Sequence, residues 1–164
     1  MSRLHIVQAE PQDVPVIHEM IIELSDHLGL AHEVVATEDD IRNALFGPAR
    51  QAEVLLARLA GAAVGFALFY GNYSTFRGRC GIHLEDLYVR PKARGRKVGK
   101  GLLAELARIT LERGCTRLEW WVLAEDQGAV AFYGRLGATA KDEWTVYRMR
   151  GDALRVLAEA ADAG

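Results

Sequence analysis

Basic residues and glycines are concentrated in the stretch "RGRKVGKG", residues 94–101, where an apolar helical pattern begins. Six of the eleven residues at positions 90–100 are Arg or Lys. Glycines permit backbone conformations with positive φ that point successive N–H groups into one concavity, and the N-terminus of a helix attracts negative charge. The stretch therefore predicts an anion site of the kind that holds the phosphates of a cofactor.

Other phosphate-binding motifs fit this stretch less well. A Walker loop needs GxxxxGK[ST], but one residue too few separates Gly95 from Gly99 and the hydroxyl residue is missing. The dinucleotide fingerprint GxGxxG is also missing. Val98 and the glycines interrupt the basic run that a nucleic-acid patch would have. From the residues alone, a phosphate site is favoured, while a solvated charged loop and a nucleic-acid patch stay open.

Apolar spacing and turn residues predict that strands and helices are mixed along the chain. Strands are expected at residues 4–7, 53–59, 62–70, 82–89, 116–123 and 144–150. Helices are expected at residues 13–28, 37–47, 98–114, 127–136 and 152–161. Some of the strands are joined by hairpins and others by helices, which indicates an α/β or α+β protein with one sheet covered on both faces.

The strand at residues 82–89 carries two adjacent carboxylates, Glu85 and Asp86. Because side chains alternate between the faces of a strand, Glu85 is expected on the same face as His83, Leu87 and Val89. Asp86 is expected on the opposite face, in a structural role, together with Ile82, Leu84 and Tyr88. The five histidines show no metal-binding spacing, and only His83 is a candidate for catalysis, because it lies near Glu85.

Length and composition indicate one domain. With 164 residues, half of them hydrophobic, the chain is long enough for a full core and too short for two ordinary domains, so residues 1–164 are expected to form a single domain. No run of about 18 apolar residues and no secretory signal is found, so a soluble cytoplasmic protein without a membrane partner is expected. Cys80 and Cys115 lack zinc-binding spacing and are expected to be free thiols.

The charge of the chain is polarised although its net charge is only −2. Residues 1–46 contain nine Asp or Glu and two Arg, whereas the remaining residues contain 13 acids and 18 bases. The small net charge argues against a general polyanion-binding protein, and no nucleic-acid partner is expected. The acidic part is suited to a cation and the basic part to an anion.

The segment "LEDLYVRPKARGRKVGKGLL" resembles the acetyl-CoA signature of the GCN5-related N-acetyltransferases (GNAT), (R/Q)-x-x-G-x-(G/A). Residues 94–99 occupy this pattern, with Lys97 where many members have a further glycine. The resemblance implies a mixed, mostly antiparallel sheet of six to seven strands flanked by helices. It also implies acetyl-CoA as cosubstrate and no metal.

Further segments, in order, are similar to the diamine acetyltransferases and their thialysine N-acetyltransferase relatives. They are "ELSDHLGL", "TEDDI", "LFG", "VGFALFY", "YSTFRGR", "LEDLYV" and "AVAFYGRLGA". The segment "YSTFRGR" looks closer to the thialysine type, because the diamine enzymes have an acidic residue near the position of Ser74. The resemblance implies a small-molecule primary amine as acceptor, direct attack in a ternary complex, and a homodimer.

The resemblance implies catalytic roles for Glu85 and Tyr133. An alkylamine has a pKa near 10.4, so a base must remove its proton, and Glu85 stands at the position of the family's proton-accepting glutamate. Tyr133 matches the family's general acid. With reference pKa values of about 10 for Tyr and about 8.5 for a thiol, full proton transfer to the leaving thiolate is uphill by about 2 kcal/mol, which favours a hydrogen bond. The pattern alone also allows an ion-paired Glu85 and a core Tyr133.

The resemblance places acetyl-CoA along the glycine-rich turn and the strand before it. Expected cofactor contacts are Leu87, Tyr88, Val89, Arg94, Gly95, Arg96, Lys97, Val98, Gly99, Lys100, Asp126, Ala129 and Arg135. Asp126 stands where relatives commonly have an Asn that binds pantetheine, and Arg135 is equally compatible with an exposed helical base. The acceptor is expected to contact Asp26, His27 and Leu28, at the end of the first helix, together with Glu85.

The expected function is therefore acetyl transfer from acetyl-CoA to a small primary amine. The sequence leaves three alternative functions open: acetylation of a protein lysine or N-terminus, an acetyl-CoA-binding module without turnover, and nucleic-acid binding.

Overall fold

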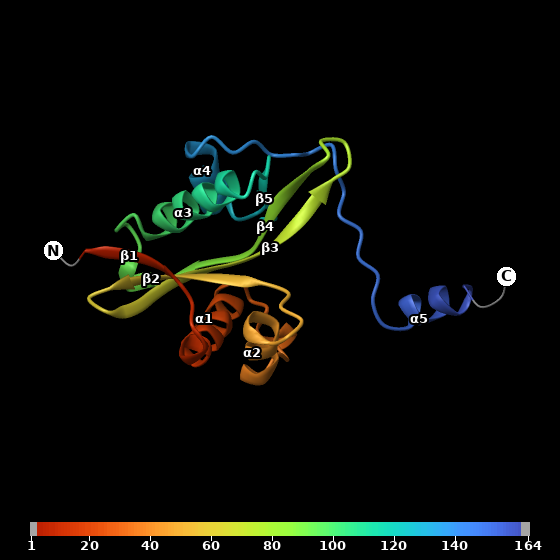
Figure 1. Cartoon of the computed structure of the whole chain (residues 1–164), viewed down its shortest axis with the longest axis horizontal. Helices are drawn as coiled ribbons and strands as arrows, with labels where there is room; N and C mark the ends of the chain where they lie inside the picture. Colours follow the sequence, from red (N-terminus) through yellow and green to blue (C-terminus); the bar gives the residue numbers. More distant parts are fainter. Residues whose placement is uncertain (1–2, 162–164) are drawn as a thin grey trace. The chain divides into compact units, whose positions relative to one another are not determined.

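The structure is a computed structural model that describes residues 3–161 (Figure 1). The chain divides into two compact units, of which the first ends at Trp121 and the second begins at Val122. The described residues of the second unit form two helices, α4 (Gln127–Arg135) and α5 (Asp152–Glu159). Within the described range, no helix is long and apolar enough to cross a membrane.

One five-stranded sheet forms the centre of the first unit. Its strands lie in sequence order: β1 (Leu4–Gln8), β2 (Glu53–Leu59), β3 (Ala62–Ser74), β4 (Arg79–Val89) and β5 (Leu118–Trp120). Neighbouring strands are antiparallel except β4 and β5, which are parallel and are connected through a helix. The mixed, mostly antiparallel sheet confirms the predicted fold class.

The described residues form five strands rather than the six or seven expected. Residues 144–150 are irregular, although their β-favouring side chains predicted a strand. Trp144 and Tyr147 are 70% and 93% exposed, and no strand of the described sheet pairs with this segment. A strand needs a neighbouring ladder and a face to bury, so the local residue preference was not sufficient here.

Helices cover both faces of the sheet (Figure 1). On one face lie α1 (Val14–His27) and α2 (Glu38–Phe46), and on the other lies α3 (Val98–Glu112). Three short 3₁₀ turns, Pro11–Asp13, Ala31–Glu33 and Pro91–Ala93, join these elements. The core under α1 and α2 includes Ile17, Met20 and Phe66, each fully buried. Leu102 and Leu106 of α3 are equally buried.

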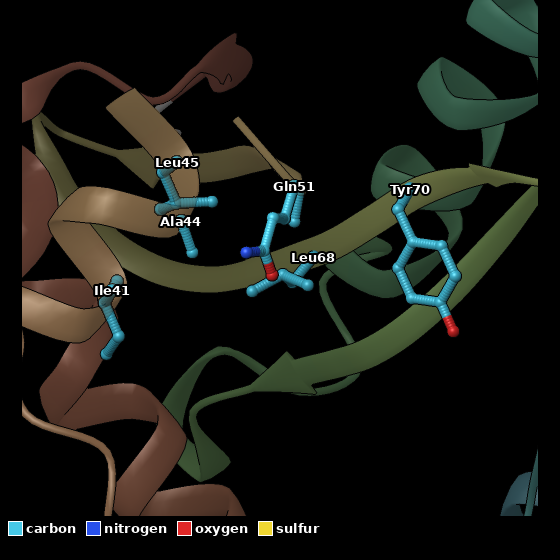
Figure 2. Close-up of a pocket in the computed structure, with 7 residues that line it drawn as sticks. Ile41, Ala44, Leu45, Gln51, Leu68 and Tyr70 are labelled. Carbon is cyan, nitrogen blue, oxygen red and sulfur yellow. The ribbon is translucent and has the colours of Figure 1, made fainter. Parts of the chain in front are cut away.

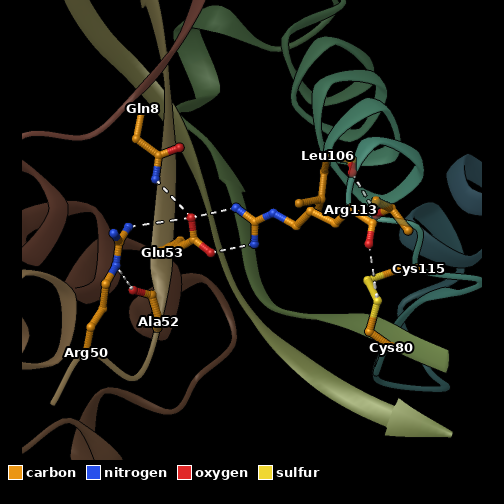
Figure 3. Close-up of polar contacts among 9 residues, drawn as sticks. Gln8, Arg50, Ala52, Glu53, Cys80, Leu106, Arg113 and Cys115 are labelled. Atoms are coloured by element: carbon orange, nitrogen blue, oxygen red, sulfur yellow. Dashed lines mark hydrogen bonds and ion pairs between the residues drawn. A yellow bond between two sulfur atoms is a disulfide. The ribbon is translucent and has the colours of Figure 1, made fainter.

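Cys80 and Cys115 form a disulfide, so the expectation of free thiols is wrong. Cys80 lies in β4 and Cys115 follows α3, and their Cα atoms are 4.6 Å apart although 35 residues separate them in sequence. The fold brings the two thiols together, and their spacing alone gave no indication of it. Figure 3 shows Arg113 beside them, reaching toward Glu53 of β2. Arg113 Nη1 and Nη2 donate to Glu53 Oε1 and Oε2 at 2.7 and 2.8 Å. These links attach the end of α3 to the sheet.

Candidate active site

The turn that leads into α3 has the backbone conformation of an anion site. Gly95 has φ 76° and Lys97 has φ 63°. The helix begins at Val98, and Gly101 N donates to Lys97 O at 2.9 Å. The three amides between Lys97 and Gly101 therefore have no carbonyl partner within the helix, and they lie at the positive end of its dipole. This geometry supports the predicted phosphate site.

Lys97 keeps a left-handed backbone without being a glycine. In the described residues, only Lys97 and Ala60 combine a side chain with a positive φ. This conformation costs about 1–2 kcal/mol for a residue with a Cβ, which is a physical reason to have glycine at the position. The Lys97 side chain is exposed, as are those of Arg96 and Lys100. Arg94 Nε donates to Val89 O at 3.0 Å and so attaches the turn to β4.

Arg90 connects the start of this turn to α1. Its Nη2 lies 2.7 Å from Glu23 Oε1 and 2.7 Å from Glu19 Oε2, and its Nε donates to Glu23 at 3.0 Å. Its Nη1 donates to Ala63 O at 3.2 Å. The hydrogen bonds with Glu23 are the main reason that the pKa of Arg90 is raised. The end of β4 is thereby fixed against the helix whose last turn carries the expected acceptor residues.

The second half of β4 has an open edge. The short strand β5 pairs only with Ile82, His83 and Leu84 of β4, whereas β4 continues to Val89. No other described strand lies on that side, so backbone groups in the segment 85–89 are available to an extended ligand, except the Val89 carbonyl, which accepts from Arg94 Nε. Leu87, Tyr88 and Val89 lie in this segment, although the Tyr88 side chain itself is buried in the core.

A β-bulge at Glu85 changes which side chains of β4 share a face. Leu84 pairs with Phe69 and Asp86 pairs with Leu68, so one residue of β4 has no partner on β3. Because Phe69 and Leu68 point to opposite faces, Leu84 and Asp86 do so as well. Asp86 therefore lies on the α1 and α2 face with Glu85, and its expected position on the opposite face is wrong.

The side chains of Tyr70 and His83 both approach the Glu85 carboxylate. Tyr70 Oη donates to Glu85 Oε2 at 3.3 Å, and His83 Nε2 lies 3.6 Å from the same oxygen. The rings of Tyr70 and His83 are stacked with centroids 5.0 Å apart, and Trp121 meets the His83 ring edge-on at 5.2 Å. Burial, and then the Glu85 carboxylate, raise the pKa of Tyr70, so its phenol stays neutral and donates. The Glu85 side chain is about half exposed and accessible to an acceptor.

Asp86 is the second carboxylate of this face, whereas the sequence predicted a structural role for it on the opposite face. Burial, and then the charge of Glu85, raise the pKa of Asp86 to about 6. In the described part of the chain, no cation or hydrogen-bond donor contacts its carboxylate. The only signal in the sequence was its position next to Glu85. A carboxylate pair of this kind attracts a cation and accepts a proton more readily than a solvated carboxylate.

The end of α1 is exposed. Asp26, His27 and Leu28 are all exposed. Gly29 N donates to Asp26 O and Leu28 N donates to Leu24 O, which closes the helix. Among the described residues, no hydrogen bond or ion pair joins this segment to Glu85, so its acceptor role stays a prediction.

The second unit contains the other predicted residues. Asp126 caps α4, because its Oδ1 accepts from Ala129 N at 2.9 Å. The two residues are thus tied to each other, which gives Asp126 a structural role that an Asn would also fill. Burial, and then Asp126, raise the pKa of Tyr133. Arg135 is exposed in the last turn of α4.

An apolar pocket of about 360 Å³ lies between α2 and β3 (Figure 2). Its lining consists of Ile41, Ala44, Leu45, Gln51, Ala52, Leu68 and Tyr70. Sequence reasoning gave no indication of this pocket, because it depends on how α2 packs on the sheet.

Comparisons with known proteins agree on one family. The model of the acetyltransferase (GNAT) family matches residues 20–138, which include residues of both units. The chain is 33% identical to a thialysine N-epsilon-acetyltransferase of Bos taurus, over 96% of this chain and 99% of that protein. It is 27% identical to an L-ornithine N5-acetyltransferase of Arabidopsis thaliana, over 95% and 87% of the two chains.

A solved structure shares the fold. An integron cassette protein from V. cholerae superposes with a TM-score of 0.80 at 26% identity, covering 97% of this chain and 99% of that one.

Proposed function

The chain belongs to the acetyltransferase (GNAT) family, and from this premise we propose that the enzyme acetylates a primary amine of a small molecule with acetyl-CoA. The acceptor is a thialysine-like or lysine-like amino acid, or a diamine or polyamine. The observation that carries the proposal is that Glu85, an accessible carboxylate, lies on the strand that precedes the glycine-rich turn at the start of α3. Relatives named for thialysine and ornithine support an amine on a small molecule.

The residues around the turn fit acetyl-CoA. The left-handed backbone at Gly95 and Lys97 presents the first amides of α3, and the exposed Arg96 and Lys100 add positive charge for phosphates. The open edge of β4 offers backbone donors and acceptors to the pantetheine arm. When bound, acetyl-CoA supplies an activated acetyl thioester. No metal is part of the proposal, and the described residues hold no cluster of metal-binding side chains.

Glu85 serves as the base in this proposal. The amine must be neutral to attack, and Glu85 accepts its proton directly or through a water molecule. The nitrogen then forms a bond to the acetyl carbon, the carbon–sulfur bond breaks, and the nitrogen gives its extra proton to the departing CoA sulfur, which leaves as the thiol. The hydrogen bond from Tyr70 holds the Glu85 carboxylate in place.

Tyr133 stabilises the leaving sulfur in this proposal. Its raised pKa makes it a weaker acid than an ordinary tyrosine, so full proton transfer to a thiolate is even less favourable than the reference values indicate. We therefore assign to Tyr133 a hydrogen bond that strengthens as negative charge develops on sulfur.

A thiol-release assay with acetyl-CoA tests the function. We expect CoA release with a panel of small primary amines, and we expect Glu85→Gln to lower kcat by about 100-fold or more. Asp39→Asn is a matched control, since Asp39 is an exposed carboxylate of α2. Release with peptides alone would favour a protein acetyltransferase, and acetyl-CoA binding without turnover would favour a regulatory module.

The proposal also includes assembly and location. We propose that residues 1–164 act as one catalytic domain in the cytoplasm and that the enzyme is a homodimer. The support for a dimer is the row of apolar side chains exposed near the C-terminus, among them Trp144, Tyr147 and Val156 at 70%, 93% and 66%. A sedimentation measurement that gave a monomer would contradict the dimer.

A further inference from the structure

The imidazole of His83 is a buried polar group beside the catalytic carboxylate. Its side chain is 7% exposed, and the rings of Tyr70 and Trp121 pack against it with centroids 5.0 and 5.2 Å away. In the described part of the chain, the one polar contact of its ring nitrogens is with Glu85, whose Oε2 lies 3.6 Å from His83 Nε2. Burying a polar group without a partner is unfavourable, so the ring depends on this carboxylate.

Tyr70 and His83 act differently on Glu85. Tyr70 Oη donates to Glu85 Oε2 at 3.3 Å, and burial raises the pKa of Tyr70, so the neutral phenol holds the carboxylate and is no base. An imidazole nitrogen without a hydrogen has a free electron pair, and an imidazole binds a proton more tightly than a carboxylate does. A proton that arrives on Glu85 therefore has an acceptor in His83 and none in Tyr70.

The other charged groups near the ring are engaged elsewhere or do not contact it. Glu119 lies beside His83 on β5. Its carboxylate accepts from Asn72 Nδ2 at 2.7 Å and lies 3.4 Å from Arg117 Nη2. Asp86 lies on the same face of the sheet, but within residues 3–161 no hydrogen bond or ion pair joins it to the ring. The 3.6 Å approach is therefore the route by which a proton reaches the ring.

We propose that His83 receives, through Glu85, the proton that the acceptor amine loses. An N–H bond of the ammonium breaks and its proton goes to the Glu85 carboxylate. The resulting carboxyl then gives this proton to the electron pair of His83 Nε2, which forms an imidazolium and leaves Glu85 negative. The restored carboxylate stabilises the positive charge that develops on the nitrogen as it attacks the acetyl carbon.

His83 acts through Glu85 and does not itself touch the acceptor. The 3.6 Å separation is longer than a hydrogen bond, and contacts between catalytic groups commonly shorten when substrate binds. After the reaction, the proton returns to solvent through Glu85, whose side chain is half exposed. This inference rests on the proposed function, because it adds a positioning residue to the base of that reaction.

His83→Gln separates proton transfer from hydrogen bonding. The glutamine amide donates to Glu85 but takes up no proton at neutral pH. We expect kcat for CoA release to fall about tenfold, since Glu85 can still give its proton to solvent, with an unchanged KM for acetyl-CoA. His32→Gln is the matched control and should leave kcat unchanged, because His32 lies 3.8 Å from Glu33 in an exposed pair of the same type. A wild-type kcat in His83→Gln would overturn the proposal.

The pH dependence gives a readout that a purely structural role would not change. An imidazole ordinarily takes up a proton as the pH falls from about 8 to about 5, and a ring that already holds a proton receives none from Glu85. The ratio of the wild-type kcat to that of His83→Gln should therefore fall from about ten at pH 8 toward one at pH 5. The same decline should appear when both proteins also carry Asp86→Asn. A ratio that is constant with pH would contradict the proposal.

Chemical rescue tests the basicity of the ring separately from its packing. His83→Ala leaves a space of the size of the ring, and added imidazole should raise its kcat about tenfold. Pyrazole has the same shape but is a much weaker base, so it should not raise kcat. Equal effects of the two compounds would show that the ring only fills space. If melting curves show that His83→Ala does not fold, the pH dependence of His83→Gln decides.

These measurements separate the inference from the proposed function. If amines release CoA with the wild type, and His83→Gln matches it at every pH, the inference fails and the function stands. If no amine releases CoA with the wild type, the proposed function fails and the inference fails with it.

Discussion

Replacing Asp86 by asparagine should stabilise the free protein at neutral pH. The folded pKa of Asp86 is about 6, against a usual value of 3.8. Because the unfolded state releases this proton more readily, ionisation of Asp86 weakens folding as the pH rises through this range. A shift of about two units corresponds to about 3 kcal/mol at pH 8, at 1.36 kcal/mol per unit, and about half of it accumulates between pH 5 and pH 8.

Urea unfolding of the wild type and Asp86→Asn between pH 5 and pH 8 measures this effect. From pH 5 to pH 8, the unfolding free energy of the wild type should fall relative to that of Asp86→Asn by more than 1 kcal/mol. The other titratable groups are common to both proteins, so the comparison isolates the effect of residue 86. The control Asp39→Asn removes an exposed carboxylate and should leave the pH dependence unchanged. A difference between wild type and Asp86→Asn that is constant with pH would refute the reasoning.

Three further predictions concern stability and rate. Cys115→Ser should lower the unfolding free energy of the oxidised protein by about 4 kcal/mol, because it opens the loop that the disulfide closes. Added reductant should lower the unfolding free energy of the wild type by the same amount. No effect of reductant in urea unfolding would contradict the disulfide. Lys97→Gly should stabilise the protein by up to about 1 kcal/mol. Glycine relieves the strain of the left-handed backbone, but it also gives the unfolded chain more conformational entropy, which offsets part of the gain. A lower unfolding free energy in Lys97→Gly would count against that strain. Tyr133→Phe should reduce kcat for acetyl transfer by about 10–100-fold with little change in the KM for amine, whereas an unchanged kcat in single-turnover measurements would assign Tyr133 to the core.

The parts of the site that depend on local backbone chemistry could be predicted from the sequence. Gly95 has the positive φ expected of a phosphate-binding turn, and a helix begins at Val98 as its apolar spacing indicated. These features are set by neighbouring residues in the chain. The family signature then identified the acetyl-transfer chemistry.

The predictions that were wrong concern geometry that residues far apart in sequence determine. The β-bulge at Glu85 arises where the register of β3 and β4 shifts, and a single extra residue reverses the face of Asp86. The disulfide depends on β4 lying beside the segment after α3, and no strand within residues 3–161 pairs with the segment at 144–150. No short window of sequence contains this information.

The cluster of Arg90 with Glu19 and Glu23 makes the effects of mutation at these positions non-additive. Removing Arg90 alone leaves two acidic groups facing each other on α1, and removing Glu23 alone leaves a guanidinium with one carboxylate fewer. Residues that share one network usually show interaction energies of about 0.5–3 kcal/mol in double-mutant cycles. The combined variant Arg90→Met with Glu23→Gln should therefore lose less unfolding free energy than the sum of the losses in the two single variants. Single substitutions in this cluster thus do not give the effect of changing its residues together.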